Sequence, residues 1–266
     1  MDRIDKILAH EGFGSRKDIK KMLRASEVLV NGTRVFDASF SVDCEKDVIV
    51  IDGEEINLRG EVYLMMNKVQ GTISSNKDGE HRTVFDLLSD EYKTPYLEDR
   101  LHLIGRLDMD TEGLLLFTTD GSLTHKLISP KSHVSKTYFV GLHKTVTESE
   151  KKSIEEQFKN GIHIEREDNE DACDCLPAEI TWCTLEQIKH YCINSSKNPD
   201  DIIEAALLTI YEGKYHQVKR MFSAVGNHVD YLKRISIGKL ELDTSLILGQ
   251  TYELDDDSLD LIFGSL

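Results

Sequence analysis

The sequence predicts an α+β fold in two unequal domains, and three observations lead to this prediction. Helical stretches and β-rich stretches alternate irregularly, without the regular strand and helix order of a parallel α/β sheet. Asn31-Gly32 and Asp52-Gly53 adjoin β-forming runs and indicate tight hairpins. With 266 residues, the chain is close to the size at which a single hydrophobic core stops growing, which favours two domains.

The chain is expected to open with two short helices followed by strands. Ile4, Ile7 and Leu8 have the spacing of one helical face. Ser15, with Asp18 three residues later, is typical of a capping box that starts a second helix.

The second helix is expected to carry a basic surface. Its apolar stripe of Ile19, Met22 and Leu23 would turn the opposite face toward solvent, where a phosphate backbone could lie against it. The candidate RNA-binding residues on that face are Arg16, Lys17, Lys20, Lys21 and Arg24.

A domain boundary is expected where the pattern breaks, around residues 57–61. A new strand begins at residues 62–66, so we predict domains of residues 1–59 and 60–266. In the second domain, strands are predicted at 113–118 and 205–211, and helices at 148–158 and 214–225.

The formal net charge of -16 argues at first sight against a nucleic-acid partner, since phosphate contacts require Lys and Arg. The charge is segregated, however. Residues 1–34 hold eight Lys or Arg against five Asp or Glu, and residues 212–239 hold six against two. The acid is concentrated elsewhere, notably at 165–171 and 255–257. Two basic islands in an acidic chain suggest local contact with RNA, although solvated helix faces are the simpler reading of charge alone.

Composition also bears on the compartment. The N-terminus lacks the apolar stretch of a secretory signal, and the longest apolar runs, such as 114–117, are far below the roughly 20 residues that cross a bilayer. Five cysteines without framework spacing fit a reducing environment. We therefore expect a cytoplasmic protein without a membrane partner.

One stretch is the strongest candidate for a catalytic loop: Gly105-Arg-Leu-Asp-Met-Asp-Thr-Glu-Gly-Leu-Leu-Leu-Phe-Thr-Thr-Asp-Gly121. This stretch places a loop rich in carboxylates directly before an apolar strand, and a buried strand holds such a loop in place, as covalent catalysis requires. A solvated turn is the ordinary alternative for such a loop. Its pattern does not say which of Asp108, Asp110 or Glu112 would act.

The same stretch resembles the signature of the RsuA and RluA pseudouridine synthases, in which Gly-Arg-Leu-Asp precedes a Thr and then Gly-Leu-Leu. The resemblance implies that Asp108 is the catalytic aspartate and that Arg106 lies beside a flipped nucleotide. Asp110 and Glu112 would then be supporting or merely polar residues.

Two further stretches resemble this family. In Ser135-Lys-Thr-Tyr-Phe-Val140, the side chains of Lys136 and Tyr138 share one face of a strand. By spacing alone Tyr138 is a packed strand aromatic, whereas the resemblance implies that it stacks on the target base and can transfer a proton. Lys136 becomes a candidate substrate-binding residue.

The third stretch is Glu212-Gly-Lys-Tyr-His-Gln-Val-Lys-Arg-Met-Phe-Ser-Ala-Val-Gly-Asn227, where spacing alone makes Lys219 and Arg220 ordinary surface cations. The resemblance implies that Lys219 pairs with the catalytic aspartate, at a position where many relatives carry Arg. His216, Gln217 and Arg220 are further candidate substrate-binding residues.

The resemblance extends over nearly the whole chain. The first 55 to 60 residues resemble the S4 RNA-binding domain, and the remainder implies a catalytic domain built on a mixed, mostly antiparallel sheet with flanking helices. The implied activity is the isomerisation of one uridine in ribosomal RNA to pseudouridine. This reaction gains no atom and involves no redox change, so no cofactor and no metal are expected.

The closest branch by resemblance acts on 16S RNA, so the expected partner is 16S ribosomal RNA or an assembling small subunit, bound by a monomer. Three alternatives stay open: an enzyme of the same family acting on 23S RNA, a non-catalytic S4-type RNA-binding or ribosome-associated protein, and a glycoside hydrolase using Asp108 and Glu112. Whether the aspartate attacks the sugar or base or removes a sugar proton is also open.

Residues 165–201 depart from the family pattern. This long, acidic stretch carries Cys173, Cys175, Cys183 and Cys192, with His190 nearby. Zinc binding is conceivable, but the paired Cys-x-x-Cys spacing of zinc sites is missing. We predict an inserted or divergent loop with ordinary thiols.

Overall fold

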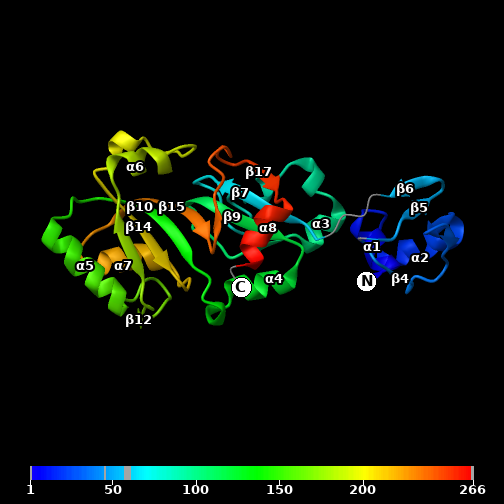
Figure 1. The fold of residues 1–266 in the computed structure, drawn as a ribbon, viewed down its shortest axis with the longest axis horizontal. Coiled ribbons are helices and arrows are strands. Elements are labelled where there is room, and N and C mark those ends of the chain that lie inside the picture. Colours follow the sequence, from blue (N-terminus) through cyan, green and yellow to red (C-terminus); the bar gives the residue numbers. More distant parts are fainter. Residues whose placement is uncertain (1, 45, 57–60, 265–266) are drawn as a thin grey trace. The chain divides into compact units, whose positions relative to one another are not determined.

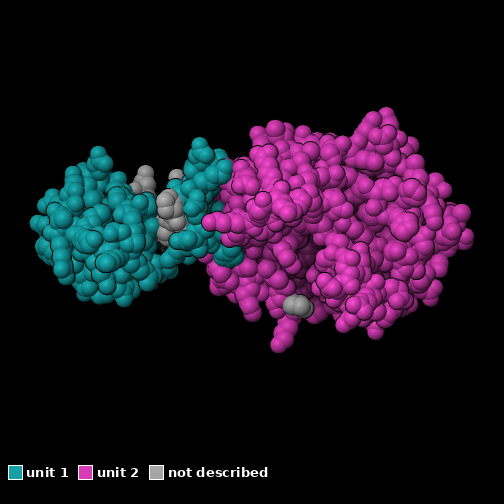
Figure 2. All heavy atoms as spheres, turned by 180° about the vertical axis from the view of Figure 1, so that it is seen from behind, with its two compact units in different colours: residues 1–62, 89–102 teal, residues 63–88, 103–266 magenta. Residues whose placement is uncertain are grey.

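The computed structural model describes residues 2–44, 46–56 and 61–264. It consists of two compact units, one of residues 1–62 and 89–102 and the other of residues 63–88 and 103–266 (Figures 1 and 2). The domain boundary expected between residues 59 and 60 lies outside the described residues and stays a prediction.

The first unit packs short helices against small sheets. Its four-stranded antiparallel sheet has the order β3-β2-β5-β6, and β1 pairs with β4. The elements are β1 (Asp2–Arg3), α1 (Ile4–His10), α2 (Arg16–Ala25), β2 (Val28–Val30), β3 (Thr33–Arg34), β4 (Ser41–Val42), β5 (Ile49–Ile51), β6 (Glu54–Ile56), η2 (Asp90–Tyr92) and α3 (Pro95–Arg100).

Local signals in this unit are confirmed. Ser15 and Asp18 form the predicted capping box at the start of α2. Asn31 and Asp52 both have φ near 49° and are each followed by a glycine with positive φ, the backbone that a two-residue hairpin requires. The basic residues of α2 are exposed opposite the buried Ile19 and Leu23.

The second unit is built on a nine-stranded sheet whose main order is β13-β14-β10-β15-β9-β7-β17. Every pair in it with a described register is antiparallel except β15 with β9, which confirms the expected mixed, mostly antiparallel sheet. Its strands are β7 (Tyr63–Lys68), β8 (His102–Ile104), β9 (Glu112–Thr118), β10 (Lys136–Leu142), β13 (Glu179–Trp182), β14 (Glu204–Ile210), β15 (Val229–Ile237), β16 (Leu240–Glu241) and β17 (Thr251–Glu253), and a separate ribbon joins β11 (His163–Ile164) to β12 (Cys173–Asp174).

Helices cover both faces of this sheet (Figure 1). Because side chains alternate along a strand, Lys136 and Tyr138 of β10 face one side with α4 and α7, while Thr137 faces the other side with α6. The helices of the unit are η1 (Phe85–Leu87), α4 (Gly121–Ile128), η3 (Pro130–Ser132), α5 (Glu148–Asn160), α6 (Leu185–Tyr191), η4 (Pro199–Asp201), α7 (Gln217–Ala224) and α8 (Asp256–Phe263). None of the helices in the described ranges is long and apolar enough to span a bilayer.

The parallel contact between β15 and β9 joins the two halves of the sheet. It pairs Lys233 with Glu112 and Arg234 with Gly113. Gly113 has φ of 100°, and a Cβ at this position would fall well inside contact distance of the Arg234 backbone oxygen. Only glycine therefore lets the two strands approach at this point.

Two expectations differ from the structure. The helix expected at 214–225 begins only at Gln217, because His216 takes a left-handed φ of 46° and the residues before it form a turn. The prediction of a loop over residues 165–201 is wrong in part, since β12, β13 and α6 lie within this range. The missed signal for α6 was its capping box of Thr184 and Gln187.

Candidate active site

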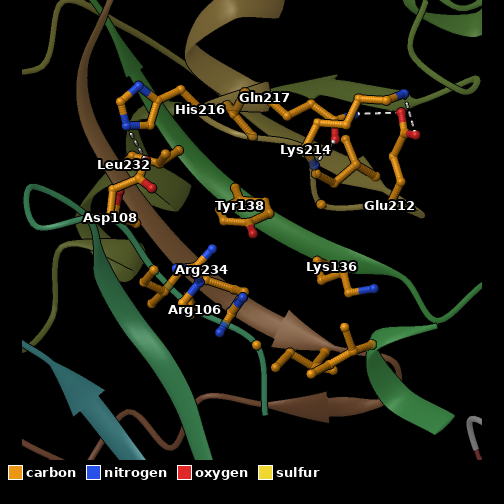
Figure 3. A pocket seen from close by; sticks show the side chains of 18 of the residues that line it. Arg106, Asp108, Lys136, Tyr138, Glu212, Lys214, His216, Gln217, Leu232 and Arg234 are labelled. Atoms are coloured by element: carbon orange, nitrogen blue, oxygen red, sulfur yellow. Dashed lines mark hydrogen bonds and ion pairs between the residues drawn. The ribbon is translucent and has the colours of Figure 1, made fainter. Parts of the chain in front are cut away.

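A cavity of about 340 Å³ lies on the α7 side of the sheet in the second unit (Figure 3). Its floor comes from β10 and β15, through Lys136, Tyr138, Leu232 and Arg234. The loop at residues 104–108 and the segment at 212–218 form its walls. Two of the three stretches singled out in the sequence thus face each other across the third.

A buried lysine braces the aspartate loop. Lys68, at the end of β7, is fully buried, and its Nζ lies 2.9 Å from the backbone oxygens of Asp108 and Thr111 and 3.4 Å from that of Met109. Burial lowers the pKa of this ammonium to about 8. Ser74 adds a second brace, since its Oγ donates to the Leu107 oxygen at 2.7 Å. The backbone of the aspartate loop is therefore held in place by the side chains of Lys68 and Ser74.

Asp108 and Lys219 meet inside the cavity wall. Lys219 Nζ donates to Asp108 Oδ2 at 3.0 Å and to Asp110 Oδ1 at 2.6 Å. Burial disfavours the charge on Lys219, but its hydrogen bonds to the two aspartates outweigh burial and raise its pKa. The contact with Asp110 is the shorter one. Asp108 nevertheless is the aspartate that lines the cavity, whereas the Asp110 side chain is 69% exposed and lies outside the lining.

His216 also approaches the Asp108 carboxylate. Its Nε2 lies 3.8 Å from Asp108 Oδ2 (Figure 3). Its Nδ1 lies 3.2 Å from Glu167 Oε1. The ring stacks on that of Tyr215, with centroids 3.8 Å apart. Asp108 Oδ2 therefore lies close to both an ammonium and an imidazole, which are supplied by the start of α7.

Tyr138 stands in the middle of the cavity floor, with Asp108 and Arg106 to one side and Lys136 to the other (Figure 3). It is 9% exposed, so its ring offers a face to the cavity while the rest packs in the sheet. Arg106 is exposed at the rim. Residues from three distant parts of the chain thus surround one cavity.

Two other candidate substrate-binding residues, Gln217 and Arg220, form hydrogen bonds within the protein. The Gln217 side chain lines the cavity, but its Nε2 donates to Glu212 and its Oε1 accepts from the Lys214 backbone. Arg220, expected at the surface from spacing, is 6% exposed and donates to the backbone oxygens of Glu165, Tyr215 and Asp171. It orders the acidic segment and does not line the cavity. The five basic residues of α2 belong to the first unit, whereas this cavity lies in the second.

Glu112, which suggested the hydrolase alternative, is fully buried away from the cavity. Its carboxylate accepts from the Tyr231 hydroxyl at 2.6 Å and from the Ser196 backbone. The two-carboxylate geometry of a glycoside hydrolase is therefore not formed by Asp108 and Glu112.

Three residues of this region are not indicated as site residues by the sequence pattern: Lys68, Lys214 and Arg234. The available signal for Arg234 was a Lys-Arg pair inside the otherwise β-forming run at 229–237. Among the described residues, no cluster of His, Cys, Asp and Glu is placed to hold a metal, and the cysteines are unpaired. Burial raises the pKa of Cys175 to about 11 and of Cys183 to about 12.

Comparison with known proteins gives two family matches. Residues 62–224 match the model described as RNA pseudouridylate synthase, and residues 2–49 match the S4 domain.

Relatives match over almost the full length. The chain is 40% identical to "Uncharacterized RNA pseudouridine synthase YtzG" of Bacillus subtilis, over 98% of both chains. It is 35% identical to "Ribosomal small subunit pseudouridine synthase A" of Escherichia coli, over 97% of this chain and 98% of the relative. A solved structure described as "Crystal structure of pseudouridylate synthase" superposes with a TM-score of 0.59 at 34% identity, covering 98% of this chain and all of that one.

Proposed function

Since the chain belongs to the RNA pseudouridylate synthase family, we propose that it isomerises one uridine of 16S ribosomal RNA to pseudouridine with Asp108 as its catalytic aspartate. The observation that carries the assignment of Asp108 is its 3.0 Å contact with Lys219, made while Asp108 lines a cavity whose floor includes Tyr138. The choice of 16S RNA rests on the small-subunit enzymes at 35% to 37% identity.

The reaction breaks the bond from uracil N1 to the sugar C1′ and forms a bond from C5 to C1′. The proton on C5 leaves, and N1 gains one, so atoms and electrons balance without a further reactant. The target uridine must leave its stack to enter the cavity, which costs a few kcal/mol. Arg106, exposed at the rim, would fill the place that the base leaves or hold its phosphate.

Asp108 begins the reaction in either of two routes, by attack on the nucleotide or by removal of a sugar proton. Both routes need a carboxylate in fixed position, and Lys219 supplies the opposite charge at 3.0 Å in a half-buried setting. Tyr138 would stack on the uracil and lie close enough to C5 for proton transfer.

Mapping pseudouridines in ribosomal RNA tests this function. Cells lacking the protein are expected to lose one pseudouridine of 16S RNA, and the wild-type gene should restore it while an Asp108→Asn gene should not. Loss of a 23S position instead would assign the enzyme to the large subunit. A complete and unchanged pseudouridine map in both RNAs would contradict the proposed activity.

We further propose that the exposed basic face of α2 binds the RNA backbone outside the target nucleotide. Changing Lys17, Lys20 and Lys21 to Gln should weaken binding and make the slope of log affinity against log salt less negative by about 0.7 to 0.9 per lost phosphate contact. Filter binding from low to high salt measures this slope. Lys152→Gln with Lys159→Gln, which removes two positive charges from the exposed face of α5 where the α2 variant removes three, is the control and should leave the slope unchanged. An equal slope in the α2 variant would remove that helix from the RNA interface.

The cavity is complete within one chain, which supports a monomer, and the substrate would place the enzyme in the cytoplasm. Sedimentation at micromolar concentration tests whether the protein is a monomer.

A further inference from the structure

The charges that line the cavity are unevenly compensated. Each lining carboxylate has a lysine partner: Asp108 has Lys219 at 3.0 Å, and Glu212 has Lys214 at 2.5 Å. Three other lining residues are cations, namely Arg106, Lys136 and Arg234. Within the described part of the chain, none of these three forms an ion pair with a carboxylate.

Arg234 is the most deeply buried of these three cations, so its charge loses the most contact with water. It is 4% exposed, its Nε donates to the Leu114 backbone oxygen at 2.8 Å, and its Nη2 is buried without a hydrogen-bond partner in the described structure. Burying a guanidinium without a counter-charge, and leaving one of its N–H groups unsatisfied, is unfavourable. Arg234 and Arg106 both line the cavity whose floor includes Tyr138 (Figure 3).

Lys136 is likewise partly removed from water without a carboxylate partner in the described structure. It is half-buried on the neighbouring strand, and its Nζ donates to the Val134 backbone oxygen at 2.9 Å. Burial and the positive charge of Arg234 lower the pKa of Lys136 to about 8. Two cations that disfavour each other's charge in one cavity form a site that an anion would stabilise.

We propose that Arg234, with Lys136 and Arg106, is an anion subsite that binds one of the two phosphodiesters flanking the target uridine. This inference rests on the proposed function, since it takes the substrate to be a uridine in RNA. The only anionic groups near such a uridine are its flanking phosphates. The subsite sets the direction of the nucleotide: the phosphate lies at Arg234, the uracil at Tyr138, and the sugar toward Asp108. Guanidinium groups suit this role because they bind phosphate oxygens with two parallel N–H groups.

A purely structural role for Arg234 must be separated from phosphate binding, since its Nε also supports β9. Lys233 is the matched control. It is the preceding residue of β15, is equally 4% exposed, and donates to the backbone oxygens of Tyr191 and Ile193 on the opposite face of the sheet. Lys233→Gln therefore removes a buried cation from the same strand without entering the cavity.

The experiment uses full-length enzyme and an RNA that carries the mapped uridine, with a neutral methylphosphonate in place of either flanking phosphate. Wild-type kcat/KM is expected to fall about 10- to 100-fold for one of the two replacements. Arg234→Gln should show a loss of that size on natural RNA and no further loss on the same methylphosphonate RNA. Lys233→Gln should keep the full methylphosphonate penalty.

Arg234→Lys keeps a charge in the subsite and should also keep part of the penalty, which serves if Arg234→Gln does not fold. The inference is overturned if neither replacement slows the wild type, or if Arg234→Gln suffers the same further loss as the wild type. Turnover of natural RNA by the wild type in the same assay establishes the activity separately, so failure of the subsite and failure of the proposed function are distinguishable.

Discussion

Asp108→Asn is expected to abolish pseudouridine formation, with a loss of at least about 1,000-fold in kcat, while RNA affinity changes little. The amide is nearly the same size as the carboxylate, so the loop held by Lys68 should keep its shape. It has no negative charge to attack the nucleotide or to take a proton from it. Single-turnover release of tritium from uridine labelled at C5 measures the chemical step, and filter binding measures affinity.

Asp110→Asn is the matched control, because it removes the other carboxylate bonded to Lys219 from the same loop. Asp110 does not line the cavity and its side chain is 69% exposed, so we expect less than a tenfold loss. Normal turnover by the Asp108 variant would show that another group is the nucleophile. Equal loss in the two variants would mean that Lys219 needs both carboxylates for its position.

Lys68→Met is expected to lower the free energy of unfolding by about 2 to 4 kcal/mol and to reduce kcat by about 100-fold. The methionine side chain fills a similar volume but leaves the backbone oxygens of Asp108 and Thr111 buried without their donor. The aspartate loop would then shift to find new partners. Chemical denaturation and single-turnover kinetics, at a temperature where the variant is fully folded, separate the two effects.

Lys233→Met controls for the loss of a buried lysine that donates only to backbone oxygens. A comparable loss of stability with activity retained is expected, because Lys233 lies on the face opposite the cavity. If Lys68→Met kept full activity once folded, bracing by Lys68 would not matter for catalysis.

The features that were predictable from sequence are those decided within a few residues. The Asn31-Gly32 hairpin and the Ser15 capping box depend on local backbone geometry and one side-chain contact. The apolar runs at β9 and β14 likewise determine central strands by themselves.

The features that were not predictable depend on the assembled sheet. Nothing near Lys68 in the sequence shows that its ammonium reaches a loop 40 residues later. The parallel contact of β15 with β9 depends on the missing side chain of Gly113. From the residues alone, Asp108, Asp110 and Glu112 were equivalent candidates. They are separated by burial of Glu112 and exposure of Asp110, both properties of the folded chain.

The contact between Asp108 and Lys219 joins positions that lie 111 residues apart. A ribosome making this protein therefore completes the aspartate loop well before it adds the ammonium, and β15, which carries Arg234, emerges later still. A growing or prematurely released polypeptide therefore has the Asp108 carboxylate without its lysine partner and without part of the cavity floor. The order of synthesis thus leaves the Asp108 carboxylate without Lys219 and Arg234 until the polypeptide is nearly finished, whereas the basic face of α2 is made first.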